Sequence, residues 1–261
     1  MDILLTNDDG VFAPGIIALA TRLTEGGHRC FVVAPDRERS SIGHAITLNR
    51  PLRLWMLDRS PYPERCSVRA CDGTPSDCVV LAVEEVLPKP DILLSGINCG
   101  PNLGDDLTYS GTVSAAMEGL ILGISSIAVS LNCEEADPRR HYETAAAVVL
   151  TLLSHIETTP LPKDVLLNVN VPNRPLASIR GIRVTRKGIR QYEEKITRRT
   201  DPEGRTLFSM AGRVADQLDE GSDVWAVAHG YVSVTPIHMD MTHYPSLEAL
   251  QKGDLENINL R

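Results

Sequence analysis

Short apolar segments alternate with longer amphipathic segments through residues 1–180, and this alternation restricts the possible fold more than any other feature of the chain. The apolar segments are typical of buried strands, because each is short and stops at polar residues, Gly or Pro. Strands that alternate with helices predict an α/β fold: a doubly wound, mostly parallel sheet with helices on both faces. The expected strands are residues 3–5, 29–35, 91–98, 125–131 and 165–171, and the expected helices are residues 14–25, 74–87, 113–122 and 141–156.

Two regions depart from this alternation. Residues 45–58 and 66–70 alternate loosely and indicate an antiparallel excursion. Residues 186–205 are highly charged with few apolar anchors, which predicts a protruding hairpin or an arm exchanged between subunits. Around and after that stretch we expect short strands and a closing helix, at residues 182–185, 206–210, 231–235 and 246–255.

Composition limits the partners of the chain. The 261 residues are 43% hydrophobic and carry a formal net charge of −8, which disfavours a nucleic-acid polymer or an anionic membrane as partner. A small anionic substrate is compatible with that charge if a metal ion supplies local positive charge. The six cysteines show no C-x-x-C pair, which indicates reduced thiols in a cytosolic protein. The sequence shows no signal peptide and no apolar segment long enough to cross a bilayer, so we expect a cytoplasmic location.

Oxygen-bearing side chains follow the expected parallel strands. Asp8 and Asp9 come after the first strand, Ser40 and Ser41 after the second, and Asn98 ends the third. The carboxyl ends of parallel strands share one edge of a sheet, so these residues converge there. Adjacent carboxylates repel each other, so either solvent screens them or a cation lies between them. An all-oxygen set suits Mg²⁺, Mn²⁺ or Ca²⁺ and not zinc; the alternative is two loop acids, a helix cap and a turn former.

A second candidate feature is the helix start at Ser110, Gly111 and Thr112. Its backbone N–H groups and two hydroxyls would cradle a phosphate, although an ordinary helix cap has the same pattern. His44 lies in a loop expected at the same edge and could protonate a leaving group; a surface or capping histidine is the alternative. The chain contains neither G-x-G-x-x-G nor G-x-x-x-x-G-K-[ST], so a dinucleotide dehydrogenase or a P-loop enzyme is unsupported.

Motifs spread in order across nearly the whole chain resemble those of one family. They occupy residues 3–15, 34–40, 73–78, 95–104, 109–113 and 235–240. Together they resemble the SurE (survival protein E) family of metal-dependent nucleoside monophosphate phosphatases. The resemblance implies that Asp8, Asp9, Ser40 and Asn98 bind one divalent cation per subunit, Mg²⁺ or Mn²⁺. It also implies a Rossmann-like core, an extended C-terminal arm exchanged between subunits, and a homodimer or homotetramer.

On this basis we expect one SurE-type unit with three parts: a Rossmann-like catalytic core of residues 1–180, an oligomerisation arm of residues 181–235, and a C-terminal segment of residues 236–261. The expected activity is hydrolysis of nucleoside 5′- and 3′-monophosphates, with exopolyphosphatase activity in addition. Asp8 would ligate the metal and activate the attacking water, with a direct nucleophilic role as the alternative. Ser110, Gly111 and Thr112, with Asn102 nearby, would hold the phosphoryl group.

The sequence also bears on two other functions. A metal-dependent deacetylase also places paired acids after a first strand, but it normally needs histidine ligands and prefers zinc. No histidine follows Asp9 closely. A non-enzymatic nucleotide-binding regulator would leave unexplained why an acidic pair faces an anionic ligand.

Overall fold

A nine-stranded sheet forms the centre of the computed structural model, in the order β3-β4-β2-β1-β5-β6-β7-β13-β8. The structure describes residues 1–57, 61–134, 136–193, 196–210, 212–253 and 255–258. Six of the strands are parallel to one another: β1 (Asp2–Thr6), β2 (Arg29–Pro35), β4 (Ser67–Cys71), β5 (Ile92–Cys99), β6 (Ser126–Asn132) and β7 (Val165–Pro172). The predicted mostly parallel sheet is therefore confirmed.

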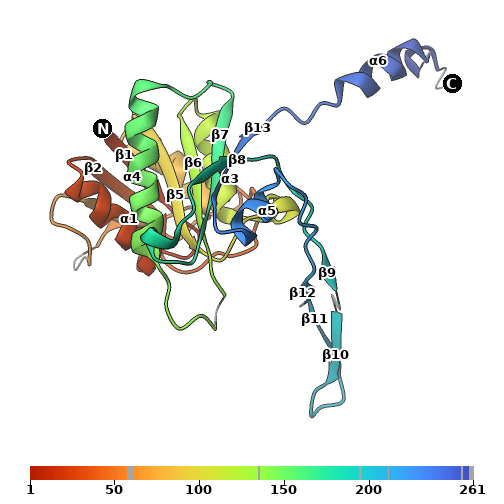
Figure 1. The fold of residues 1–261 in the computed structure, drawn as a ribbon, viewed down its shortest axis with the longest axis horizontal. Helices are drawn as coiled ribbons and strands as arrows, with labels where there is room; N and C mark the ends of the chain where they lie inside the picture. Colours follow the sequence, from red (N-terminus) through yellow and green to blue (C-terminus); the bar gives the residue numbers. More distant parts are fainter. Residues whose placement is uncertain (58–60, 135, 194–195, 211, 254, 259–261) are drawn as a thin grey trace.

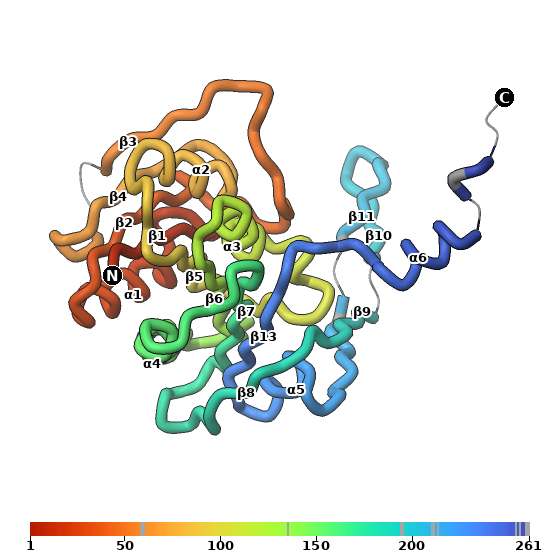
Figure 2. The backbone as a smooth tube through the Cα atoms, turned by 90° about the horizontal axis from the view of Figure 1, so that it is seen from above, coloured from red at the N-terminus to blue at the C-terminus, as the bar shows by residue number. Residues whose placement is uncertain are grey.

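Helices cover both faces of this sheet (Figures 1 and 2). The helices α1 (Pro14–Glu25) and α4 (Tyr142–Thr158) pack together over one face, where their apolar residues share a core with β1, β5 and β6. The helices α2 (Pro75–Glu85) and α3 (Gly111–Ile121) cover the other face, over smaller apolar clusters. The result is the predicted three-layer α/β arrangement, with β1 and β5 buried at its centre.

The N-terminus of α2 shows how local sequence fixes an element beside the site. Thr74 Oγ1 accepts from the Asp77 backbone N at 3.0 Å, and Asp77 Oδ2 accepts from the Thr74 backbone N at 2.8 Å, which forms a capping box. Asp77 also accepts from the backbone N and the hydroxyl of Thr47, at 2.9 and 2.6 Å. One buried carboxylate thus starts a helix and fastens the long loop that precedes it.

Of the antiparallel excursion predicted at residues 45–58 and 66–70, only part is antiparallel. The strand β3 (Leu54–Met56) pairs antiparallel with β4, but β4 is itself parallel to β2 and belongs to the main sheet. Residues 45–53 form no strand because hydrogen bonds to the side chains of Asp77 and Asp72 hold this loop instead. Asp58, at the end of the expected segment, lies outside the described residues.

The segment predicted as an arm, residues 181–235, is divided in the structure. Its two ends join the main sheet: β8 (Ile182–Val184) runs parallel to β13 (Val232–His238), and β13 runs antiparallel to β7. The short helix α5 (Asp223–Ala228), which the sequence pattern did not predict, packs against β13 and β7. Only the part between β8 and α5 projects from the core (Figure 1).

That projecting part consists of two short antiparallel pairs. The strand β9 (Tyr192–Glu193) pairs with β12 (Arg213–Val214), and β10 (Ile196–Thr200) pairs with β11 (Thr206–Met210). Residues 194 and 195, inside the predicted charged stretch, lie outside the described residues. We call residues 186–221 the hairpin arm.

The predicted closing helix is present as α6 (Tyr244–Lys252), followed by the 3-10 helix η3 (Leu255–Asn257), but it does not close the core. It extends away from the sheet (Figures 1 and 2), and its Tyr244, Leu247 and Leu250 side chains are exposed. Two further 3-10 helices connect elements of the core: η1 (Gly104–Thr108) and η2 (Leu176–Ser178). Within the described ranges, every helix is too short or too polar to cross a membrane.

Candidate metal and phosphate site

The loop after β1 is shaped by Asn7, which is fully buried. Its side-chain amide donates to the Gly10 carbonyl at 2.9 Å, and its Oδ1 accepts from the Gly10 backbone N at 3.2 Å. Gly10 has φ +99° and lies against the backbone of Arg37, a conformation and a spacing that exclude a side chain. This closed loop presents Asp8 and Asp9 at the carboxyl end of the sheet.

Asp8 is buried, with 4% of its surface exposed, and the first turn of α3 holds its carboxylate. Thr112 donates to it twice, from the backbone N to Oδ2 at 3.1 Å and from Oγ1 to Oδ1 at 2.5 Å. A Cβ on Gly111 would lie 2.8 Å from Asp8 Cβ, so only glycine allows this approach. Burial raises the pKa of Asp8, against the opposing effect of the Thr112 hydrogen bonds. Gly111 and Thr112 thus contact Asp8 directly, and their contact with phosphate stays a prediction.

Asp9 points to a different partner. Its Oδ2 accepts from the backbone N of Cys99 at 3.0 Å, which ties the β1 loop to the end of β5. Burial, and then the neighbouring charge of Asp8, raise the pKa of Asp9 to about 7. The two adjacent carboxylates therefore have separate anchors, and the charge of Asp8 disfavours the charged form of Asp9.

The end of β5 carries Asn98. The pairing of β5 with β6 shifts register between Ser95 and Asn98, and such an irregularity re-aims side chains at a strand end. Asn98 Nδ2 donates to the Gly100 carbonyl at 2.8 Å. That hydrogen bond orients the amide and leaves Oδ1 with no hydrogen-bond partner among the described residues. Asn98 thus offers a fixed carbonyl oxygen at the predicted edge.

A pocket of about 670 Å³ joins these strand ends. Its volume is in the range of small-molecule sites. It brings together five of the residues predicted from sequence, and Ser41, Cys99, Gly100, Pro101, Asp106, Tyr109 and Tyr192 complete the lining. The five are Asp8, Ser40, Asn98, Asn102 and Ser110. Asp9, Gly111 and Thr112 lie directly behind this lining, through their contacts with Cys99 and Asp8.

The residues at this pocket fit a hard divalent cation. Two carboxylates, a hydroxyl and an amide oxygen are the donor types that Mg²⁺ and Mn²⁺ prefer. Burial disfavours the negative charges of Asp8 and Asp9, and the charge of Asp8 further disfavours that of Asp9, a cost that a bound cation would offset. Among the described residues, no group of three or more His, Cys, Asp or Glu side chains could hold a metal ion. A cation here would therefore use hydroxyl and amide oxygens beside the two acids.

Ser40 and Asn102 are held in different ways. Ser40 is exposed, and its hydroxyl donates to Glu38 Oε1 at 2.6 Å. Asn102 is buried, and its Nδ2 donates to Ser130 Oγ at 2.8 Å. The Asn102 carbonyl also accepts from the side chains of Asn168 and Asn170. Asn102 is thus a rigid part of the pocket floor, whereas Ser40 is at its open side.

His44, predicted near the leaving group, is not part of the pocket lining. Its Nε2 lies 2.8 Å from Glu118 Oε2, and Glu118 is a buried carboxylate two turns along α3 from its start. In the structure His44 is thus the partner of a buried acid, Glu118. Its role toward substrate stays a prediction.

Several residues of the site were not among the predicted site residues. Glu38 adds negative charge near Asp8 and Asp9, since it contributes to raising the pKa of both. Cys99 anchors Asp9 through its backbone, a contact that no side-chain pattern reveals. Tyr109 directly precedes the predicted Ser110, so its position could have been read from the sequence, but Tyr192 comes from the hairpin arm and reaches the pocket only in the folded chain.

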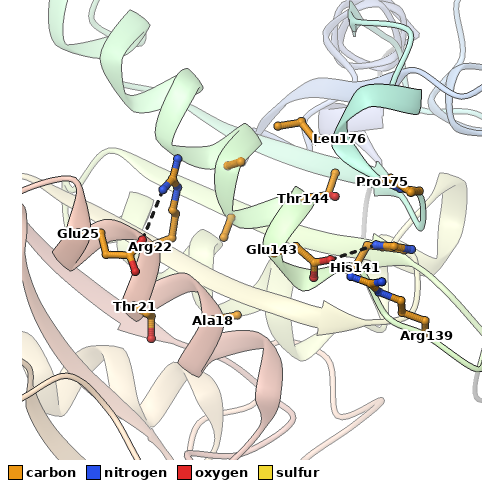
Figure 3. A pocket seen from close by; sticks show the side chains of 12 residues that line it. Ala18, Thr21, Arg22, Glu25, Arg139, His141, Glu143, Thr144, Pro175 and Leu176 are labelled. Carbon is orange, nitrogen blue, oxygen red and sulfur yellow. Dashed lines mark hydrogen bonds and ion pairs between the residues drawn. The ribbon is translucent and has the colours of Figure 1, made fainter.

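A separate pocket of about 580 Å³ lies between α1 and α4 (Figure 3). Its charged side chains pair with one another: Arg22 with Glu25 at 3.4 Å, and both Arg139 and His141 with Glu143, at 2.9 and 3.1 Å. Exposed pairs of this kind leave little net charge to attract a ligand. This pocket does not include the predicted site residues.

Comparisons with known proteins show what this chain is similar to. A family model described as "Survival protein SurE" matches residues 3–194. The chain is 48% identical over 258 residues to the 5′-nucleotidase SurE of a Synechococcus species, covering 98% of both chains. It is 48% identical over 262 residues to the 5′-nucleotidase SurE of Geobacter metallireducens, covering 100% of both. The crystal structure of the SurE protein from Aquifex aeolicus matches with a TM-score of 0.82 and 43% identity, over 97% of this chain and 99% of that one.

Proposed function

The chain belongs to the SurE family, and we therefore propose that it is a divalent-metal-dependent phosphatase that hydrolyses nucleoside 5′-monophosphates to nucleoside and phosphate. The names of the relatives, which share its full length, support the 5′-nucleotidase activity. The proposal extends to nucleoside 3′-monophosphates and to exopolyphosphatase activity, as the family resemblance implies.

The observation that carries this proposal is a pair of adjacent carboxylates at one edge of the sheet. Asp8 is buried and lines a pocket with further oxygen donors, and the partly buried Asp9 lies directly behind that lining. Asp8, Asp9, Ser40 and Asn98 would hold one Mg²⁺ or Mn²⁺ per subunit. When bound, the cation would supply positive charge for the phosphoryl oxygens and would lower the pKa of an attacking water.

The side chains themselves divide the remaining work. Asp8 would take a proton from water; its position in the pocket lining and the Thr112 hydroxyl that donates to its Oδ1 support this role. Asp9, which lies behind the lining, would act mainly as a ligand. The Ser110 Oγ accepts from the backbone N of Val113 at 3.1 Å, which leaves its O–H free to donate to a phosphoryl oxygen.

The proposed assembly is a homodimer or homotetramer with exchanged arms. The helix α6 supports it, since its Tyr244, Leu247 and Leu250 side chains are 57%, 43% and 54% exposed within one chain. An amphipathic helix that leaves its apolar side chains uncovered is stabilised when another surface buries them.

Phosphate release from a panel of nucleotides tests the activity. The purified protein should release phosphate from AMP with Mg²⁺ or Mn²⁺, lose the activity on chelation, and regain it when metal is restored. A deacetylase would release acetate from acetylated substrates instead, and a regulator would bind the nucleotide without turnover. Full phosphatase activity of protein shown to be metal-free by elemental analysis would contradict the proposal.

A further inference from the structure

The base of the hairpin arm forms one wall of the metal and phosphate pocket. Tyr192, the first residue of β9, lines that pocket together with Tyr109 and with the acids and amides of the strand ends. Aromatic residues make up only 4% of the chain, and two of them lie at this one pocket. The lining therefore combines oxygen donors with aromatic surface.

The Tyr192 ring is held in place on several sides. Its hydroxyl donates to Asp106 Oδ2, and Arg190 pairs with the same carboxylate at 3.2 Å. The Arg190 guanidinium carbon lies 5.8 Å from the ring centroid. Gly212 packs so closely that a Cβ on it would lie 3.0 Å from Tyr192 Cβ. A ring fixed in this way loses little conformational entropy when a ligand binds to it.

The segment that carries Tyr192 is fastened to the core by Asp223, a fully buried carboxylate at the start of α5. Asp223 accepts from the backbone N of Gly188 at 2.7 Å and from the backbone N of Gly104 at 3.0 Å. Gly104 begins η1, which carries Asp106, the partner of Tyr192. Asp223 thus fixes the position of the hairpin arm relative to η1, and with it the position of the Tyr192 ring.

We propose that the Tyr192 ring is the surface on which the base of a nucleoside monophosphate stacks, and that Tyr192 is the residue that distinguishes nucleotides from other phosphate monoesters. The inference rests on the proposed nucleotidase function. The phosphate of such a substrate belongs at the oxygen donors around Asp8, and the flat π-face of its base stacks favourably on an aromatic ring in the same pocket. Tyr109 is 66% exposed, whereas the hydroxyl of Tyr192 is anchored, which favours Tyr192 as the platform.

Steady-state kinetics with two substrates test this assignment. AMP carries a base, and ribose 5-phosphate is the same substrate without it. In Tyr192→Ala, kcat/KM for AMP should fall by about tenfold or more, mainly through KM, and by clearly more than kcat/KM for ribose 5-phosphate. Tyr192→Phe keeps the ring and should retain the wild-type ratio of the two kcat/KM values.

Tyr244→Ala is the matched control. Tyr244 also donates its hydroxyl to an aspartate, Asp240, but it lies on α6 outside the pocket, so its removal should leave the AMP to ribose 5-phosphate ratio unchanged. Equal losses for both substrates in Tyr192→Ala, or a Tyr192→Phe variant as impaired for AMP as Tyr192→Ala, would overturn the inference. Failure of the proposed function is a different result, since wild-type protein would then release phosphate from neither substrate.

Discussion

At the scale of single residues, the first turn of α3 binds and stabilises the carboxylate of Asp8. Thr112 gives both a backbone N–H and a hydroxyl to Asp8, and the absent side chain of Gly111 makes room for it. A helix N-terminus favours negative charge, which opposes the cost of burying the carboxylate. The same sequence motif can serve phosphate or carboxylate, and residue spacing alone does not decide between them.

Removal of the Thr112 hydroxyl should therefore impair catalysis through Asp8. Thr112→Val keeps the shape of the side chain but leaves Asp8 Oδ1 without its 2.5 Å donor. We expect kcat/KM for AMP to fall by a factor of about 10 to 100, because a displaced catalytic group loses its alignment. Thr112→Ser keeps the hydroxyl and should remain near wild type. If Val and Ser variants are equally active, the hydroxyl does not position Asp8.

The two acids should respond differently to neutralisation. Asp9→Asn should weaken Mn²⁺ binding in calorimetry and be partly rescued by excess Mn²⁺, since Asp9 lies behind the pocket lining. Asp8→Asn should stay slower than wild type by a factor of about 10² or more at saturating Mn²⁺, as expected when a group that accepts a proton is lost. Equal rescue of both variants would show that their roles are not divided.

Cys66 provides a test at neutral pH away from the site. All six cysteines are free thiols, and Cys66 is only partly buried. A hydrogen bond with Cys30 lowers the pKa of Cys66 to about 7. A lowered pKa means that the reactive thiolate is lost as pH falls below about 7 and gained as pH rises through it. Iodoacetamide labelling of Cys66, followed by peptide mass spectrometry, should rise with a midpoint near pH 7. A midpoint near the ordinary thiol value of about 8.5 would contradict the hydrogen-bonded thiolate.

At the scale of elements, sequence patterns predicted the core well and the later chain less well. The strand at residues 29–35 and the helix that Thr74 caps were predicted because apolar runs, proline and capping residues act locally. The helix α5 was missed because its six residues are too few to show a helical period. The place of β13, antiparallel to β7 and followed in the sheet by β8, depends on long-range pairing that no local pattern encodes.

The same distinction explains the site. Asp8, Ser40 and Asn98 could be predicted to converge because parallel strands end at one edge, and the pocket lining confirms that they do. The place of Tyr192 in the pocket could not be predicted, since it depends on a hydrogen bond to Asp106, which lies 86 residues away in the sequence. His44 lies outside the pocket lining, where its Nε2 pairs with Glu118 Oε2, and its role toward substrate stays a prediction.

Loss of Asp77 should destabilise an entire region of the fold. Asp77→Ala removes the acceptor for the Thr74 backbone N and for two donors of Thr47, so the free energy of unfolding should fall by about 2–3 kcal/mol. Glu84→Ala changes an exposed residue of the same helix and should cost less than about 0.5 kcal/mol. Urea denaturation of both variants measures the difference, and similar midpoints for the two would show that Asp77 is not the fastening residue.

At the scale of the whole molecule, the hairpin arm has two parts with different tasks. Its base, around Arg190 and Tyr192, is tied to the core and lines the pocket. Its tip, the pair β10 and β11, has exposed side chains such as Ile196 and Phe208, at 62% and 66%. A two-stranded hairpin is marginal by itself in water, so its tip is stabilised if another subunit packs against it.

Replacing residues 196–210 by a short Gly-Ser linker should therefore separate assembly from catalysis. Because the pocket lining includes no residue of the tip, the shortened protein should keep its nucleotide pocket. It should, however, form a smaller species than the wild-type oligomer, measured by light scattering at micromolar concentration. An unchanged molar mass would show that the tip makes no subunit contact, and a wild-type protein that is itself monomeric would contradict the exchanged-arm assembly as a whole.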